Sequence, residues 1–199
     1  MAGYPELVEG LIEQLNKFPG IGRRSAERIV YYILRSPTSE LKKLVNAIIK
    51  AKEGIRLCSI CNGFSAGEVC SICNDNKRDK GTICVVEEPK DVNAVERAGG
   101  YTGHYHVLLG SIAPLEGRGP ENLKVNELIQ RIKQNGVKEI IIATDSDTEG
   151  EATALYLARQ IKPLGINISR IGIGLPMGSN LEYADSTTIA RALSSRKQI

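Results

Sequence analysis

The chain has 199 residues, of which 42% are hydrophobic and 25% are charged, and its formal net charge at pH 7 is +3. This composition is typical of a soluble globular protein and excludes an intrinsically disordered chain. No apolar run approaches the roughly 20 residues that cross a bilayer, and the first residues form no apolar signal segment, so we expect a cytoplasmic protein without a membrane partner.

The N-terminal part of the chain predicts three amphipathic helices. Apolar side chains recur at helical spacing over residues 6 to 17, again from about Ser25, and a third time over residues 39 to 51. A break with two glycines, residues 18 to 22, separates the first two helices. We assign residues 1–54 to one helical region.

The break between the first two helices suggests a contact with DNA. Helix, Pro-Gly-Ile-Gly, helix resembles the helix-hairpin-helix element of DNA-binding proteins, because glycines permit a close approach and the second helix offers free N–H groups to a phosphate. Basic side chains near the turn could add charge-assisted bonds to the DNA backbone, which makes binding independent of base sequence. The predicted DNA-binding residues are Lys17, Gly20, Gly22, Arg23, Arg24 and Arg28. The alternative is a plain helical hairpin with a glycine turn.

Two Cys-x-x-Cys pairs, eight residues apart, follow the helical region. Four thiolates at this spacing are typical of a tetrahedral structural zinc site, and residues 55–78 contain too few apolar side chains to fold without a metal. Two disulfides would also fit the count, but no signal segment directs the chain to an oxidising compartment. We predict one zinc ion per chain, held by Cys58, Cys61, Cys70 and Cys73. Cys84 is interpreted as a small hydrophobic residue in a buried strand.

Residues 79–175 alternate between predicted strands and helices. The strands are predicted at 82–87, 105–109, 138–144 and 166–173, and the helices at 91–98, around 125–132 and at 151–160. This alternation implies a mostly parallel sheet covered on both faces, that is, an α/β domain. The remaining tail, residues 176–199, with a helix near 188–193, is too short for a domain and is assigned to assembly.

Acidic residues gather where two of these strands end. Glu87 closes the first strand, and Asp145, Asp147 and Glu149 follow the third. The carboxyl ends of parallel strands meet at one sheet edge, where carboxylates such as Glu87, Asp145 and Asp147 can share a Mg²⁺ ion. This constellation resembles the Toprim domain of topoisomerases, primases and some nucleases. The alternative is that Asp145 and Glu149 only cap or charge-complement the following helix.

Two histidines and a glycine-rich segment receive no site of their own. His104 and His106 lie in or beside the second predicted strand, so we interpret both as structural histidines with satisfied hydrogen bonds. Residues 170 to 178 hold three glycines at and after the end of the last strand and are interpreted as a turn and an assembly surface.

Taken in order, these motifs resemble the RecR family of bacterial recombination mediators over residues 5 to 196. Beside the hairpin and the four cysteines, the segments that carry the resemblance are 84–92, 105–108, 114–115, 119–121, 149–154 and 181–183. The resemblance implies a DNA-binding protein of recombinational repair that binds double- and single-stranded DNA. It implies a nucleoid-associated, ring-shaped tetramer that acts with RecO and RecF to load RecA onto single-stranded DNA. It also implies that Glu87, Asp145, Asp147 and Glu149 form a surface for RecO.

One pair of residues departs from this family pattern. RecR proteins commonly carry Asn-Pro where this chain has Asp145-Ser146, so both Asp145 and Asp147 remain, as in catalytic Toprim domains. The alternative function is therefore a small magnesium-dependent Toprim nuclease or primase-like enzyme. The sequence shows no tyrosine nucleophile in a cleavage domain and no Walker A loop, and we predict that the protein is not an enzyme.

Overall fold

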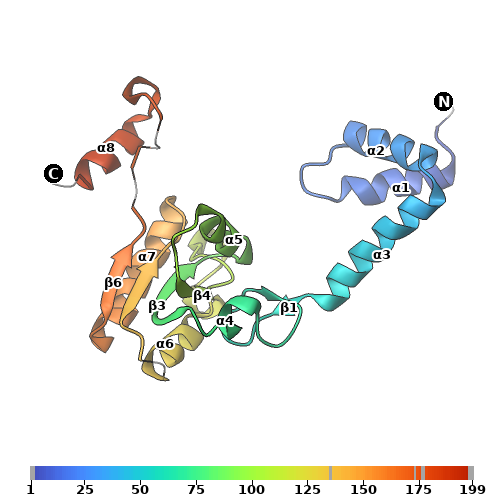
Figure 1. The fold of residues 1–199 in the computed structure, drawn as a ribbon. Helices are drawn as coiled ribbons and strands as arrows, with labels where there is room; N and C mark the ends of the chain where they lie inside the picture. The colour runs from blue at the N-terminus through green and yellow to red at the C-terminus, as the bar shows by residue number, and fades with distance from the viewer. Residues whose placement is uncertain (1–2, 135, 173, 176–177, 197–199) are drawn as a thin grey trace. The chain divides into compact units, whose positions relative to one another are not determined.

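A computed structural model describes residues 3–134, 136–172, 174–175 and 178–196 of the chain. It divides the chain into two compact units, Met1–Gly54 and Ile55–Ile199, whose helices and strands are labelled in Figure 1. Each unit has an apolar core of its own. Residue 173, the predicted end of the last strand, and residues 176–177 and 197–199 of the predicted tail lie outside the described residues.

The first unit contains the three predicted helices. They are α1 (Glu6–Asn16), α2 (Arg23–Arg35) and α3 (Thr38–Gly54). Helices α1 and α2 form a hairpin around Ile12, Ala26 and Val30, which are almost completely buried. Helix α3 has no buried residue. The core of the first unit therefore belongs to the hairpin alone.

The second unit begins with a small knuckle. It consists of β1 (Arg56–Leu57), β2 (Phe64–Ser65) and the short helix α4 (Ser71–Asn74). Strands β1 and β2 pair antiparallel. The knuckle is fixed to the main sheet because the N–H of Val107 donates to the carbonyl of Cys61 at 2.8 Å.

The main sheet of the second unit has four strands. They are β3 (Asp79–Val86), β4 (Gly103–Val107), β5 (Glu139–Ile142) and β6 (Asn167–Arg170). Their order in the sheet is β4-β3-β5-β6, and all three neighbouring pairs are parallel, so the predicted parallel α/β architecture is confirmed. Strand β4 ends earlier than predicted because Leu109 takes a φ of 65°, which extended backbone cannot adopt.

Helices flank both faces of this sheet, as Figure 1 shows. They are α5 (Pro89–Ala98), α6 (Val125–Gln134) and α7 (Thr148–Ile161). Side chains alternate along β3, so Ile83 and Val85 pack into one core with α6 and α7. Cys84 and Val86 pack into the opposite core with α5 and the knuckle. Cys84 is 3% exposed and is a core residue, as predicted, and burial raises its pKa to about 12.

Short turns and a last helix complete the second unit. The 3₁₀ turns are η1 (Pro114–Glu116), η2 (Pro120–Asn122), η3 (Lys162–Leu164) and η4 (Leu181–Tyr183), and the last helix is α8 (Ser186–Ser194). Arg191 of α8 donates to the carbonyl of Ser146 and lies 3.6 Å from the Glu151 carboxylate. Within the described parts of the chain, no helix is both long and apolar enough to cross a membrane.

Candidate functional site

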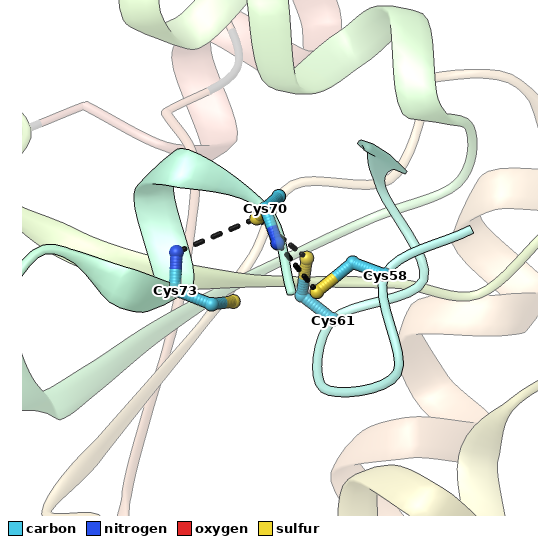
Figure 2. Close-up of side chains that lie close together, drawn as sticks. All are labelled: Cys58, Cys61, Cys70 and Cys73. Atoms are coloured by element: carbon cyan, nitrogen blue, oxygen red, sulfur yellow. Dashed lines mark hydrogen bonds between the residues drawn. The ribbon is translucent and has the colours of Figure 1, made fainter. Parts of the chain in front are cut away.

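The four predicted zinc ligands come together in the knuckle (Figure 2). One ligand atom from each of Cys58, Cys61, Cys70 and Cys73 lies within 4.8 Å of all the others. Cys58 and Cys61 sit on a tight turn closed by the N–H of Cys58, which donates to the carbonyl of Gly63 at 2.8 Å. Cys70 caps α4, and Cys73 lies on that helix. The two pairs therefore face one another from a turn and a helix start.

Backbone N–H groups donate hydrogen bonds to three of these sulfurs. The N–H of Cys70 donates to Cys58 Sγ at 3.3 Å, and those of Gly63 and Cys73 donate to Cys61 Sγ and Cys70 Sγ at 3.4 Å. Hydrogen bonds from the Cys73 thiol and the Gly63 N–H lower the pKa of Cys61 to about 5, whereas the hydrogen bond to Cys61 raises the pKa of Cys73 and burial raises that of Cys70. No disulfide joins any of the five cysteines. A set of four clustered sulfurs with N–H support fits Zn²⁺, which binds thiolates in a closed tetrahedron.

The hairpin turn in the first unit places its two glycines in different roles. Gly20 has a φ of 78°, which favours glycine, so the fold itself requires it. Gly22 is the N-cap of α2 with a φ of −81°, and an added Cβ there would meet nothing within 4 Å. The fold therefore does not require glycine at position 22, and the missing side chain leaves the N-terminus of α2 open.

The predicted basic residues around this turn are not equivalent. Arg23 pairs with Glu9 at 2.6 Å and with Glu27 at 3.4 Å, so its charge is partly compensated and it joins α1 to α2. Arg24 and Arg28 are exposed and form no ion pair with the described residues. Lys17 is exposed, its ammonium donates to the Gln14 amide oxygen at 3.0 Å, and it forms no ion pair with the residues that the structure describes. Free positive charge near the open helix end is thus supplied by Arg24, Arg28 and Lys17.

One aromatic residue beside this basic surface was missed in the sequence analysis. Ser25, Arg28, Ile29 and Tyr32 line a shallow hollow on α2. Tyr32 is 69% exposed although it is large and partly apolar. Its spacing of four residues from Arg28 on the same helix is a signal that could have indicated it.

The acidic residues lie at the carboxyl edge of the sheet, where strands β3 and β5 end side by side. Glu87 follows β3 and accepts a hydrogen bond from the backbone N–H of Asp145 at 3.0 Å. Glu87 is 8% exposed; its burial and the nearby Asp145 and Asp147 raise its pKa to about 7. Among the described residues, the carboxylates of Glu87, Asp145 and Asp147 do not cluster closely enough to form a group of metal ligands.

Helix capping explains part of this acidic cluster, with a different residue from the one expected. Asp147 is the N-cap of α7, and its carboxylate accepts the N–H of Gly150 at 2.8 Å, so the cap is Asp147 and not Asp145. Glu149 lies in the first turn of α7, where its negative charge complements the helix dipole as the alternative suggested. A Cβ at Gly150 would lie 2.1 Å from the carbonyl oxygen of Asp145, which forces glycine there. Glu149 also lies 3.3 Å from the Ser111 hydroxyl and 3.6 Å from Arg118.

Two arginines beside the acidic edge also went unnoticed in the sequence. Arg170, at the end of β6, donates to Glu151 and to the carbonyl of Asp145. Arg191 reaches the same region from α8. These contacts join distant parts of the chain, and nothing in local sequence spacing indicates them.

The two histidines are buried, as expected, but their hydrogen bonding is incomplete. His106 Nε2 lies 2.7 Å from the carbonyl of Lys124, and its buried Nδ1 has no partner among the described residues. His104 Nδ1 lies 3.3 Å from Arg131, and its Nε2 is likewise unpartnered. Burial lowers the pKa of His106 to about 4, and burial together with Arg131 lowers that of His104. Both rings are therefore neutral near pH 7.

Comparison with known proteins agrees with this arrangement of parts. The RecR helix-hairpin-helix model matches residues 8–52, the RecR four-cysteine zinc finger model residues 55–75, the Toprim domain model residues 81–172 and the RecR C-terminal model residues 174–197. The recombination protein RecR of Acidothermus cellulolyticus is 48% identical over 196 residues, and that of Thermobifida fusca is 47% identical over 196 residues. Each alignment covers 98% of both chains. The chain therefore belongs to the RecR family of recombination proteins.

Proposed function

We propose that this protein is a DNA-binding mediator of recombinational repair, which binds DNA without reading its sequence and acts with RecO and RecF to load RecA onto single-stranded DNA. Membership of the RecR family supports the repair role. The observation that carries the proposal is the open N-terminus of α2, where no side chain caps the helix and Gly22 leaves room for a ligand.

The physical basis of DNA binding is the match between this helix end and a phosphate. The first N–H groups of α2 lack partners within the helix and carry the positive end of its dipole. A DNA phosphate satisfies both, and the exposed guanidinium of Arg24 adds a charge-assisted bond. Tyr32, exposed beside Arg28, offers a surface on which an unpaired base can stack, which suits binding to single strands.

Arg24→Gln tests the helix-end contact, with Arg35→Gln as a matched control because Arg35 is exposed at the other end of α2. Loss of one phosphate contact should weaken binding equally for different DNA sequences. It should also reduce the salt slope, which is the slope of the logarithm of the binding constant against the logarithm of the salt concentration, by about 1 unit for each such contact. Adding Arg23→Gln should deepen the loss less, because Arg23 is already paired with Glu9 and Glu27. Fluorescence anisotropy over a salt series measures both quantities.

Equal affinity and equal salt slope in Arg24→Gln and wild type would place the DNA surface elsewhere. If Arg35→Gln has the same effect as Arg24→Gln, binding depends on net charge and not on the helix end. Either result contradicts this proposed site.

We further propose that the protein assembles as a homotetrameric ring. Leu44, Val45, Ile48 and Ile49 of α3 are between 46% and 59% exposed and lie at helical spacing on one face. A second copy of the chain covering this face would remove these side chains from water. Several hairpins in one ring would then contact the same duplex and add their weak affinities.

We propose that the acidic edge is the contact with RecO and that it includes a weak Mg²⁺ site, with no strand cleavage. The contact would use Glu87, Asp145, Asp147 and Glu149, and the ion would be held by the first three of these residues. The carboxylates of Asp145, Asp147 and Glu149 around Glu87 form an acidic surface that suits a basic partner. Wild-type protein incubated with supercoiled plasmid and Mg²⁺ or Mn²⁺ should leave the plasmid intact, and binding of either ion should be lost in an Asp145→Asn, Asp147→Asn double variant. Nicking that disappears in this double variant would instead establish the nuclease alternative.

A further inference from the structure

A cavity of about 220 Å³ lies between the knuckle and the main sheet. Its lining residues are Ile60, Cys73, Lys80, Ile83, His104, Arg131 and Val137. Lys80 and His104 stand near the starts of β3 and β4, so the cavity is at the amino edge of the sheet, whereas the acidic cluster is at the carboxyl edge. This cavity is therefore separate from the acidic edge and from the hairpin.

Arg131 brings a buried positive charge to this cavity. Arg131 is only 8% exposed, yet no carboxylate of the described residues lies within ion-pair distance of its guanidinium. Its guanidinium donates to the carbonyl of Tyr105 and lies 3.3 Å from His104 Nδ1, and both partners are neutral. A buried charge without a counter-charge costs several kcal/mol, so the site is stabilised when an anion enters it.

His104 provides a second donor that has nothing to bond to. Because a guanidinium only donates, His104 Nδ1 must be the acceptor in their contact. The neutral ring then carries its proton on Nε2, which is buried and has no partner among the described residues. His104 is 5% exposed, so solvent does not reach this N–H freely. An acceptor inside the cavity would satisfy it.

Lys80 adds a third donor, and the second positive charge, to the lining of the cavity. Its side chain is exposed, and within the described part of the chain it makes one hydrogen bond, at 3.4 Å to the Asn76 amide oxygen. The walls between the polar groups are apolar and come from Ile60, Ile83 and Val137. The cavity thus combines three donors from β3, β4 and α6 with room for an organic group.

We propose that this cavity is a binding site for a phosphate group, carried by a small phosphomonoester or by the end of a nucleic-acid strand. Donors on three different elements suit a tetrahedral oxyanion better than a planar carboxylate, which one arginine can bind alone. Apolar walls then contact the organic part of the ligand. A zinc ion with four thiolates carries a net negative charge, so the competing explanation is that Arg131 is only a counter-charge for the zinc centre.

Calorimetric titration of inorganic phosphate into the zinc-loaded full chain, at constant ionic strength near pH 7, tests the site. We expect saturable binding of one phosphate per chain, weakened about tenfold in Lys80→Ala, since a charge-assisted bond is lost. Lys133→Ala is the matched control because Lys133 is exposed on α6, outside the cavity lining. Arg131→Gln should abolish binding, whereas Arg131→Lys should retain part of it.

Nitrogen NMR of the histidine rings gives a second readout that does not depend on an Arg131 variant folding. The His104 Nε2 resonance should shift with phosphate, while the ring of His106, which is also buried but is absent from the cavity lining, should not. Absence of saturable binding, equal losses in Lys80→Ala and Lys133→Ala, or an unmoved His104 resonance would leave Arg131 as a counter-charge for zinc and overturn the proposal.

Further ligands identify the source of the phosphate and test the preferred shape of the anion. Tighter binding of a nucleoside monophosphate than of inorganic phosphate supports a small phosphomonoester. Preference for a 5′-phosphorylated oligonucleotide over the same strand with a 5′-hydroxyl supports a strand end. Binding of the strand by the hairpin contributes equally to both measurements, because the two oligonucleotides have the same internal phosphates. Acetate that competes as strongly as phosphate would contradict the choice of a tetrahedral oxyanion.

Discussion

Glu87 shows how one residue at a strand end can carry a proton near neutral pH. Its side chain is buried at the edge of the sheet and faces the charges of Asp145 and Asp147, so its pKa rises to about 7. The hydrogen bond from the N–H of Asp145 opposes this shift but does not cancel it. A neutral Glu87 can donate a hydrogen bond to a partner, whereas an ionised one can only accept.

This raised pKa makes stability depend on pH in a defined direction. Between about pH 4.5 and 7 the native state keeps a proton that the unfolded chain has lost, so the contribution of Glu87 to the free energy of unfolding falls as pH rises. Glu87→Gln resembles the protonated form and should remove this fall, which is on the order of 2 kcal/mol. Urea unfolding of both proteins from pH 5 to pH 8 measures the difference.

Wild type and Glu87→Gln must be compared with each other because His106 changes the free energy of unfolding with pH in the opposite direction. Its pKa is lowered to about 4, so its contribution to stability is lost as pH falls, in wild type and variant alike. Glu121→Gln, an exposed change, should leave the pH profile as in wild type. A constant difference between wild type and Glu87→Gln across this range would contradict the assigned titration.

At the scale of single elements, the knuckle depends on its metal more than on packing. Its buried side chains are mainly the cysteines themselves, with Ile72 packed against them. We therefore predict that Cys61→Ser lowers zinc content well below one ion per chain and unfolds residues 55–78, because metal binding supplies most of the folding free energy of such a module.

Cys84→Ala is the control for this prediction, since Cys84 is buried in the sheet and outside the sulfur cluster. It should keep one zinc ion per chain and cost only the stability of a small cavity. Elemental analysis and thiol alkylation measure both proteins. Full zinc content in Cys61→Ser, or loss of zinc in Cys84→Ala, would show that another set of ligands holds the ion.

The hairpin illustrates how one element divides structural and binding roles between similar residues. Arg23 and Arg24 are neighbours in the sequence, yet Arg23 links α1 to α2 through Glu9 while Arg24 remains exposed. Gly20 is required by its backbone conformation and Gly22 is not. Substitution of Arg23 or Gly20 should therefore affect folding, whereas substitution of Arg24 or Gly22 should affect binding.

At the scale of the whole molecule, the apolar face of α3 predicts self-association. Ile48→Glu places a charge in the middle of this face and should convert the proposed tetramer into smaller species, because burying an unpaired charge at an interface is costly. Lys50→Glu changes the charge more but lies on a different side of α3, so it should leave the oligomer intact.

Light scattering coupled to gel filtration, at two protein concentrations, measures this effect. A wild-type protein that remains a monomer at both concentrations would contradict the ring and with it the additive contribution of several hairpins. Equal dissociation by Ile48→Glu and Lys50→Glu would show that charge, and not the apolar face, controls assembly.

The sequence alone determined the features that rest on local spacing. The periodic apolar residues of the first unit predicted its helices, and the alternation of strands and helices predicted the parallel sheet, because both patterns follow from backbone geometry. The spacing of the two Cys-x-x-Cys pairs predicted the sulfur cluster, since it depends on two tight turns and little else. The sequence also predicted that the acidic residues at the strand ends lie along one sheet edge, because the carboxyl ends of parallel strands meet there.

Only the tertiary structure decided which partner each charged side chain contacts and which of these side chains are buried. Asp147 caps α7 while the backbone of Asp145 bonds to Glu87, and this division depends on the close approach of Gly150 to the Asp145 carbonyl. The buried Arg131 and its contact with His104 join residues 27 positions apart, so no local pattern could reveal an unpaired charge there. Spacing fixes which residues share an element, whereas burial and partner choice are set by the packing of elements that are distant in the chain.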